Sequence, residues 1–337
     1  MSLLTNLREP ATLPRRIVDW FRRDLHATWG LAVTRIVIGV FTVALVLLEW
    51  KDRLFFWGSG SGWAQPYRDE TLYTAPYWHF FSAGESDTML TLKLVVVGIL
   101  GFLVMIGLFT RAAVIALFFT MTSLIALGPT STDTEDIVVR IVLFFMIFAD
   151  TSQRLSVDRW IAERRGRIVD IGGVRPVRTG LVPMSVRIPL HNMALCLIGG
   201  QIIVLYVMAG RAKLSGAKWL DGTATYYPFH AEYLTPWPEL SHHLGQWTPL
   251  VMLMTYGSIA VQLLFPFMLL QRHTRIFIIA AMIGLHIGIA VTLGLGLFSF
   301  AMCGADFVFI RDESVEKIKT WIAERRSRSR APETVEA

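Results

Sequence analysis

One lysine, Lys213, stands where an apolar stretch of the chain gives way to small and aromatic residues. The run from Leu205 to Gly222 reads LYVMAGRAKLSGAKWLDG, so Arg211 precedes the lysine and Trp219 follows it. At the edge of an apolar chamber a lysine loses hydration, which favours a neutral amine able to accept a proton near pH 7. Alternatively, the side chain extends to the membrane surface and keeps its ammonium in water. The segment therefore predicts either a general base or an ordinary charged helix end.

Other polar residues also lie inside apolar stretches, where an unpaired charge is costly. Asp136 and Arg140 are four residues apart, so they can pair on one helix face. Any single group is explained by one structural hydrogen bond or ion pair, but several at a similar depth predict a site. The candidates to accompany Lys213 are His286, Arg140, Glu135, Asp136, Gln201, Tyr206 and Trp219. The two cysteines, Cys196 and Cys303, are expected to be buried apolar residues, and no metal site is predicted.

These residues are carried by apolar blocks that predict membrane-spanning helices. Of the 337 residues, 53% are hydrophobic and only 17% are charged, and the mean hydropathy is +0.50. A helix of about 20 residues crosses a hydrocarbon core ~30 Å thick. We therefore expect an all-α, polytopic membrane bundle of about eight spans, at 32–50, 89–109, 111–128, 135–150, 188–210, 248–270, 274–291 and 295–310.

Basic residues predict how the bundle is oriented. Arginines concentrate in the N-terminal segment, in the connection 151–187 and in the C-terminal tail. Positively charged flanks stay in the cytoplasm, and an even number of spans puts all three segments there. Both termini are then cytoplasmic, and Lys213 lies at the external side. The net charge of +6 follows these flanks, so it indicates lipid contact rather than nucleic-acid binding.

Surface helices are expected on the cytoplasmic side. In residues 15–29 an apolar face predicts an interfacial amphipathic helix, with Ile17, Trp20, Phe21, Leu25 and Trp29 on it. The sequence WIAERR occurs at 160–165 and again at 321–326, and each copy predicts a short surface helix. We divide the chain into a cytoplasmic N-terminus (1–31), a transmembrane domain (32–311) and a basic cytoplasmic tail (312–337).

Two external segments, 51–87 and 214–247, are rich in Trp, Tyr and Phe. Aromatic rings favour the headgroup layer of a bilayer, so each segment can be an interface belt. The alternative is a lid over an apolar chamber that opens outward.

Three stretches resemble a known family. GQIIVLYV followed by AGRAKLSGAKWLDG is similar to the segment around the catalytic lysine of vitamin K-dependent γ-glutamyl carboxylase and of the related bacterial HTTM (horizontally transferred transmembrane) domain proteins. The stretch at 130–158, ending in SVD, resembles the family's fourth-span region. The stretch LHIGIAVTLGLGLFSFAMCGADFVF at 285–309 resembles its late histidine block. The resemblance implies a multi-pass protein of the bacterial cytoplasmic membrane.

The resemblance also implies a chemistry. In the carboxylase the lysine deprotonates a reduced quinone, and oxygen then generates the strong base that removes a proton from glutamate before carbon dioxide adds. Lys213 and His286 match the family's lysine and late-span histidine, and the expected cofactor is a reduced quinone of menaquinone or vitamin K type. Arg140, Glu135, Asp136, Gln201, Tyr206 and Trp219 would hold it.

Two departures change the expected function. Glu135 and Asp136 stand where the carboxylase has a histidine, and its large external domain has no expected counterpart. Proton abstraction from a quinol-like compound is therefore a better expectation than full carboxylation, with a secreted peptide as substrate or an external protein as partner. A non-catalytic alternative remains open: a membrane component of a toxin-maturation or immunity system, or a lipid-binding scaffold.

Overall fold

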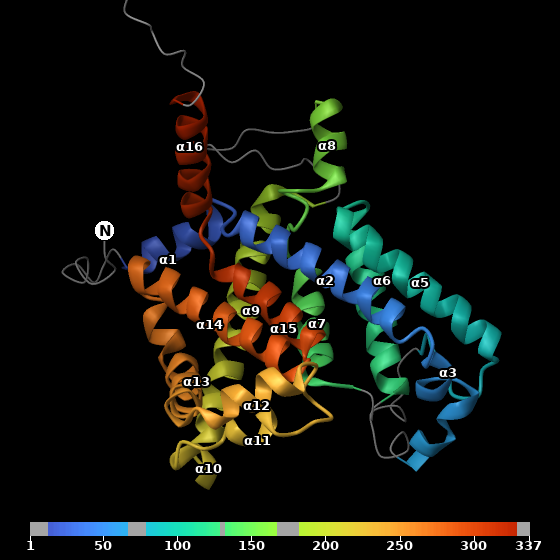
Figure 1. The fold of residues 1–337 in the computed structure, drawn as a ribbon. Coiled ribbons are helices and arrows are strands. Elements are labelled where there is room, and N and C mark those ends of the chain that lie inside the picture. Colours follow the sequence, from blue (N-terminus) through green and yellow to red (C-terminus); the bar gives the residue numbers. More distant parts are fainter. Residues whose placement is uncertain (1–12, 67–78, 129–131, 167–181, 329–337) are drawn as a thin grey trace, which may run out of the picture.

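The computed structural model describes residues 13–66, 79–128, 132–166 and 182–328, and every regular element in these ranges is helical. This confirms the all-α fold (Figure 1). Expectations that fall on 1–12, 67–78, 129–131, 167–181 and 329–337 lie outside the described residues. The first-half elements are α1 (Leu13–Arg22), α2 (Thr28–Leu48), α3 (Arg53–Phe56), η3 (Ser59–Ala64), α5 (Asp87–Ile106), α6 (Thr110–Leu127), α7 (Thr134–Met146) and α8 (Val157–Arg164). The second-half elements are α9 (Met184–Lys213), α10 (Ala217–Leu220), α11 (Tyr226–Phe229), α12 (Pro238–Gln246), α13 (Thr248–Met268), α14 (Arg272–Leu293), α15 (Gly296–Asp306), η6 (Phe307–Phe309) and α16 (Asp312–Arg328).

Six described helices are long and apolar enough to cross a membrane: α2, α5, α6, α9, α13 and α14. The other two predicted spans correspond to α7 and α15, which have only 13 and 11 residues. At the rise of an α-helix these two reach about 15–20 Å, less than the ~30 Å hydrocarbon core. Every predicted span thus contains a helix, but only six of these helices have the length of a full crossing.

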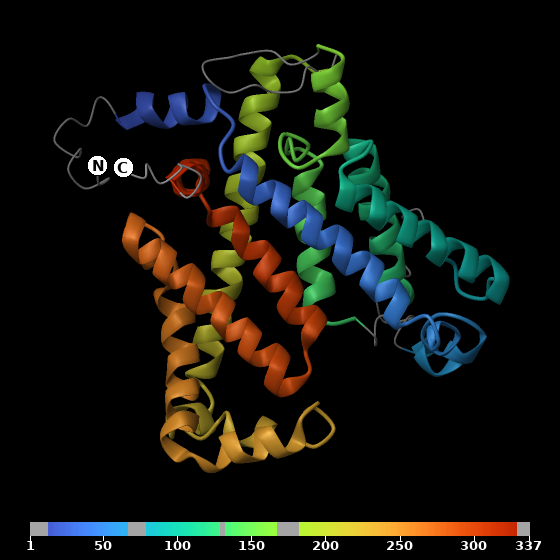
Figure 2. The ribbon, with the colours of Figure 1, turned by 45° about the horizontal axis from the view of Figure 1, so that its top comes forward.

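The short helix α15 lies in the middle of the bundle, between α2 and α14 (Figure 2). It also packs against α7. Gly304 makes the contact with α2 possible, because a Cβ there would lie 2.2 Å from Val37 Cγ1. The Thr34 hydroxyl donates to the Gly304 carbonyl at 2.8 Å. Close helix approach through small residues, with hydroxyls as cross-links, is typical of membrane bundles.

Carboxylates from distant parts of the chain hold the starts of two spanning helices. Asp312 accepts hydrogen bonds from the N–H groups of Thr28 and Trp29, both at 2.9 Å, at the start of α2. Asp158, the last residue of the SVD motif, accepts from the N–H and the hydroxyl of Thr110 at 2.8 and 2.7 Å. An anion at a helix N-terminus satisfies free N–H groups and complements the helix dipole. The SVD motif therefore has a structural role here.

The predicted interfacial helix is shorter than expected. Helix α1 ends at Arg22, and α2 begins at Thr28, so Leu25 and Trp29 do not share a helix with Ile17. The side-chain amide of Asn192 in α9 donates to the carbonyls of Trp20, Phe21 and Asp24 at 3.1, 3.2 and 2.8 Å. These bonds take carbonyls that would otherwise continue the helix, which explains the early end.

Both WIAERR copies are confirmed as helical: α8 contains the first copy except its last residue, Arg165, and α16 contains the second. The two helices project from one end of the molecule, which we call the α16 end (Figure 1). Helices α10, α11 and α12 lie at the opposite end, which we call the α12 end.

Candidate functional site

Lys213 is the last residue of α9, and its side chain is half-buried rather than extended into water. Its Nζ donates a hydrogen bond to Oε1 of Gln262 in α13 at 2.7 Å. The same Nζ lies 5.0 Å from the centre of the Trp219 ring, within the range of a cation–π contact. Lys213 is thus enclosed by one amide oxygen and one aromatic face.

Gly210, one turn before Lys213, lets α9 and α13 approach closely enough for this contact. A Cβ at Gly210 would lie 2.9 Å from the Leu263 side chain and 3.3 Å from Gln262 Cβ. The turn after Lys213 then brings Trp219 back over the amine, with Gly216 at the start of α10 next to the Trp219 ring. The local sequence AGRAKLSGAKW therefore positions Lys213 through its small residues.

A second polar cluster forms deep in the bundle from three helices. Tyr206 of α9, His286 of α14 and Asp306 of α15 are all almost fully buried, with 1%, 2% and 0% of their surfaces exposed. The Tyr206 hydroxyl donates to the Asp306 carboxylate, whose two oxygens both lie at 3.0 Å. The same hydroxyl oxygen lies 3.3 Å from His286 Nε2. His286 is close enough to Lys213 for their charges to interact.

The hydrogen-bond pattern defines which atoms of this cluster are in use. A phenol has one proton, so when Tyr206 donates to Asp306 its oxygen accepts from the Nε2–H of His286. His286 Nδ1 is then an acceptor, and it is buried without a hydrogen-bond partner among the described residues. The hydroxyl of Ser299 in α15 is likewise buried without one in the described part of the chain. Buried polar atoms of this kind require a partner, so both atoms are available to a bound molecule.

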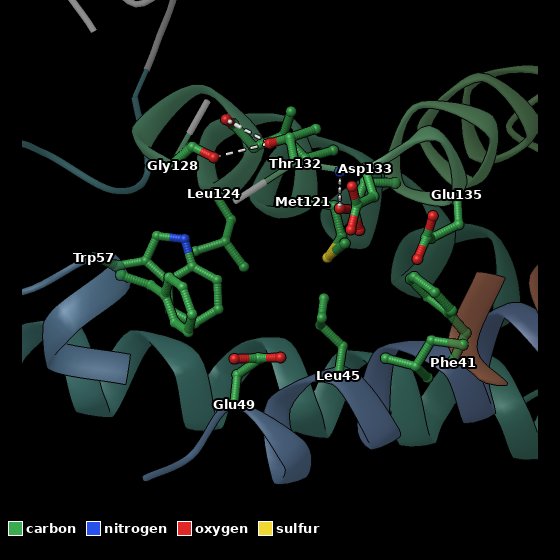
Figure 3. A pocket seen from close by; sticks show the side chains of 14 residues that line it. Phe41, Leu45, Glu49, Trp57, Met121, Leu124, Gly128, Thr132, Asp133 and Glu135 are labelled. Carbon is green, nitrogen blue, oxygen red and sulfur yellow. Dashed lines mark hydrogen bonds between the residues drawn. The ribbon is translucent and has the colours of Figure 1, made fainter. Parts of the chain in front are cut away.

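Glu135 and Asp136 lie in a different place, at a cavity of about 230 Å³ between α2, α6 and α7. Glu49, which directly follows α2, and Asp133 line the same cavity, and the ring of Trp57 forms part of its wall (Figure 3). We call this cavity, with its four carboxyl residues Glu49, Asp133, Glu135 and Asp136, the acidic pocket. Asp136 also has a structural task there, since its Oδ2 accepts from the N–H of Asp133 at 3.1 Å and so helps to cap α7.

The first turn of α15 separates the acidic pocket from the buried cluster. Leu297 lines the acidic pocket. The next residue, Phe298, packs edge-on against the His286 ring at a centroid distance of 5.4 Å. The two polar regions are therefore neighbours, although different side chains of α15 face each of them.

Other predicted site residues are not brought to these groups. Arg140 makes no ion pair with Asp136, although both are described and lie on one helix. Gln201 precedes Tyr206 by five positions, which places it about 140° away around α9, and no hydrogen bond joins it to the cluster. Of the predicted residues, the structure groups Tyr206 with His286 and Lys213 with Trp219.

Three residues of these polar groups, Asp306, Glu49 and Gln262, are not among the site residues predicted from the sequence. A usable signal existed for Asp306, because a carboxyl group at the end of an apolar block needs a buried partner. For Glu49 no such signal exists, because a carboxyl group that directly follows an apolar helix can equally face water. Within the described residues no set of three or more His, Cys, Asp or Glu side chains could hold a metal ion.

A family model matches the part of the chain that contains Lys213 and the buried cluster. Residues 182–313 match the family model described as HTTM domain, and this range contains Tyr206, Lys213, Gln262, His286 and Asp306. An uncharacterized protein of Bacillus subtilis (strain 168), YitO, is 34% identical over 115 residues. That match covers 33% of this chain and 37% of the relative, so the chain aligns with well under two thirds of the relative's length. No solved structure matches the chain significantly.

Proposed function

From the premise that this integral membrane protein carries an HTTM domain at residues 182–313, we propose that Lys213 is a general base for a lipid-soluble weak acid. A reduced quinone of menaquinone or vitamin K type is the expected compound. It would supply an acidic hydroxyl and two reducing equivalents when bound. Lys213 Nζ would accept the proton of that hydroxyl, and the electron pair of the O–H bond would remain on the oxygen.

The surroundings of Lys213 support this role. Half-burial beside Trp219 removes part of the hydration that stabilises an ammonium, so the neutral amine is accessible. After proton uptake, the carbonyl oxygen of Gln262 at 2.7 Å can hold the ammonium with a charge-assisted hydrogen bond. Half-burial and the Gln262 hydrogen bond act on Lys213 without a second charged residue. This pairing of amine and amide is the observation that carries the proposal.

We propose that the buried cluster forms hydrogen bonds with a second polar group of such a compound. His286 Nδ1 and the Ser299 hydroxyl are buried and without a partner among the described residues, so they can accept from and donate to a second oxygen. Tyr206 and Asp306 act through His286, because their hydrogen bonds keep its Nε2 protonated and orient the ring. His286 is thus proposed as a positioning group, with Trp219 and Phe298 as apolar walls.

The acidic pocket argues against carboxylation of glutamate by this chain. Glu49, Asp133, Glu135 and Asp136 surround the cavity next to the cluster, and like charges disfavour an anionic peptide there. We propose instead that Glu135 and Asp136 select a neutral or cationic segment of an external peptide or protein partner. Proton abstraction by Lys213 does not depend on that partner.

Orientation in the bacterial cytoplasmic membrane follows from the charges. Helices α8 and α16, which belong to the arginine-rich connection 151–187 and to the C-terminal tail, project from one end of the molecule, and positively charged flanks remain in the cytoplasm. We propose that the α16 end is cytoplasmic and that Lys213 works at the external side.

The test is the ionisation of a bound reduced quinone under anaerobic conditions. Purified protein in lipid nanodiscs is titrated with reduced menaquinone, and the absorption of the quinol anion is followed against pH. We expect the anion on the wild-type protein at a pH where the free quinol is neutral. Lys213→Met, which keeps an unbranched apolar stem, should shift that midpoint upward by about one pH unit or more, because its base is absent.

Lys218→Met is the matched control. Lys218 lies in α10, five residues after Lys213, and its side chain is exposed. Its interaction with Tyr227 raises its pKa, so it stays protonated at neutral pH. Bound quinone is quantified separately by extraction, so that a binding defect is distinguished from a loss of proton transfer. An unchanged anion midpoint in Lys213→Met, with quinone still bound, refutes the proposed base and leaves a non-catalytic role.

A further inference from the structure

A large groove at the α16 end lies far along α9 from Lys213 and has no part in the proposed chemistry. Its volume is about 590 Å³, within the usual range for a bound small molecule of about 300–1,000 Å³. Gly199 and Gly200 of α9 form one side, and Leu195 and Ile203 lie one turn away on the same helix. The residues following α15, from Val308 to Glu313, form the other side.

The glycines keep this space open. At Gly200 an added Cβ would meet no atom within 4 Å, so the backbone of α9 borders empty space there. At Gly199 an added Cβ would lie 3.3 Å from Phe309 Cε1, which makes the Phe309 ring the facing wall. The groove is therefore a slot between a bare stretch of helix and an aromatic ring, with apolar side chains above and below it. A slot of this shape accommodates an acyl chain.

The rim of the groove carries both signs of charge. Arg275, in the first turn of α14, uses Nε and one Nη to donate to the Leu269 carbonyl at 2.8 and 2.5 Å, which leaves its other Nη. Arg311 is exposed, and its side chain forms no hydrogen bond or ion pair within the described residues. The charge of Arg311 repels that of Arg275, and the charge of Glu313 attracts it. A phosphate between the two guanidinium groups would relieve the repulsion that Glu313 alone offsets.

The acidic residues of the rim are not equivalent. Asp312 is occupied, because its carboxylate accepts from the N–H groups of Thr28 and Trp29 and from the Thr28 hydroxyl. Glu313 is exposed, and no hydrogen bond to it is formed within the described part of the chain. The rim thus offers two cationic groups and one available carboxylate. This pattern complements a headgroup with one phosphate and one ammonium.

The groove lies at the depth where lipid headgroups are found. Arg275 is one turn inside the end of a spanning helix, and Trp20 of the amphipathic helix α1 lines the same groove. Tryptophan on a surface helix and arginine at a span end are typical of the membrane–water boundary. A ligand can therefore enter the groove sideways from the bilayer leaflet at the α16 end.

We propose that this groove is a binding site for a phospholipid that carries a primary ammonium, such as phosphatidylethanolamine. The phosphate lies between Arg275 and Arg311, the ammonium faces Glu313, and an acyl chain fills the slot along Gly199 and Gly200. The charges of the rim carry this assignment, since a site for an anionic lipid would have no use for Glu313.

The test measures which phospholipids stay bound when the full-length protein is released from nanodiscs and weighed by native mass spectrometry. The nanodiscs contain equal amounts of phosphatidylethanolamine, phosphatidylcholine and phosphatidylglycerol. We expect one retained phosphatidylethanolamine on the wild-type protein. Arg311→Gln should reduce its retention about tenfold, the effect of losing one charge-assisted hydrogen bond. Gly200→Leu, which fills the slot without a clash, should also abolish retention.

Matched controls separate this site from general lipid contact. Arg272→Gln removes a charge from the same turn of α14 but outside the groove lining, and Gly284→Leu adds the same side chain to open space on α14. Both should retain phosphatidylethanolamine. Glu313→Gln should shift the preference toward phosphatidylglycerol, an effect that misfolding would not produce. Equal retention of the three lipids by the wild-type protein, or unchanged retention in Arg311→Gln and Gly200→Leu, overturns the proposal.

Discussion

At the scale of single residues, the buried cluster depends on one phenolic hydroxyl. Tyr206 satisfies the carboxylate of Asp306, which is fully buried and forms no ion pair within the described residues. It also joins this carboxylate to His286. A buried acceptor that loses its donor pays the cost of its lost hydration, which is larger than the net gain of an ordinary hydrogen bond. The hydroxyl is therefore important for stability as well as for orienting the imidazole.

We predict that Tyr206→Phe lowers the free energy of unfolding by about 1–3 kcal/mol, because Asp306 is left without its donor. Thermal unfolding of the purified protein in detergent measures the effect. The control is Tyr256→Phe, which removes an exposed hydroxyl bonded to the Leu220 carbonyl and should cost about 0.5 kcal/mol or less.

Asp306→Asn changes the acceptor of the same hydrogen bond, and we expect it not to lower stability. An amide can still accept from Tyr206, and it removes a charge that is expensive to bury. We predict that this variant is at least as stable as the wild type in the same unfolding assay. A loss of stability as large as that of Tyr206→Phe would show that Asp306 is held by a cation rather than by the phenol alone.

The residue types of the site were partly visible in the sequence. Lys213, Tyr206 and His286 were chosen because polar groups in apolar stretches need partners, and Trp219 because it is an aromatic residue close after the lysine. The structure gives each of them a partner. Which of them meet could not be predicted, because that depends on the rotation of each helix about its axis. Glu135 and Asp136 show this, since their depth suggested the lysine site but α7 turns them toward Glu49 and Trp57.

At the scale of elements, helix ends are fixed by carboxylates from far along the chain. Asp158 caps α6 with its side chain, and its own N–H donates to the Gly107 carbonyl at 2.9 Å. We predict that Asp158→Ala lowers the free energy of unfolding by about 1–2 kcal/mol, as for loss of a good N-cap. The comparison is Asp19→Ala on α1, whose exposed pair with Arg23 is worth about 0–1 kcal/mol.

The contact between α2 and α5 is made through glycines on both helices, and Gly39 makes the closest approach. A Cβ at Gly39 would lie 2.4 Å from the Met105 nitrogen, and backbone atoms cannot move aside without separating the helices. We predict that Gly39→Ala lowers the unfolding free energy by about 1–3 kcal/mol through overpacking. Gly98→Ala on α5 is the matched control, because its added carbon would sit 3.7 Å from Val46 Cγ1 in ordinary contact, so we expect little change.

Helix positions were more predictable than helix ends. All eight expected spans contain helices, since apolar runs of this length have few alternatives in a bilayer. The ends depended on single contacts that periodicity does not reveal. The amide of Asn192, which closes α1 early, lies in a distant helix.

At the scale of the whole molecule, two proposed sites lie at different levels of α9. The Lys213 site is at its C-terminal end, and the proposed lipid groove borders its middle, from Leu195 to Ile203. The positively charged flanks predicted that α8 and α16 share one side, and Figure 1 shows both projecting from the same end. The sequence does not predict how α9, α13, α14 and α15 pack against one another, because nothing in their periodicity identifies which apolar faces meet.

The sidedness of the membrane can be measured with single cysteines in intact cells. In a protein with Cys196 and Cys303 replaced by alanine, Gln246→Cys at the end of α12 should react with a membrane-impermeant maleimide added from outside. Glu163→Cys in α8 and Thr320→Cys in α16 should react only after the membrane is permeabilised. All three positions are exposed, so accessibility reports the side of the membrane and not burial. Labelling of Thr320→Cys from outside together with Gln246→Cys would place the α12 and α16 ends on one side, and the short helices α7 and α15 could then not substitute for full crossings.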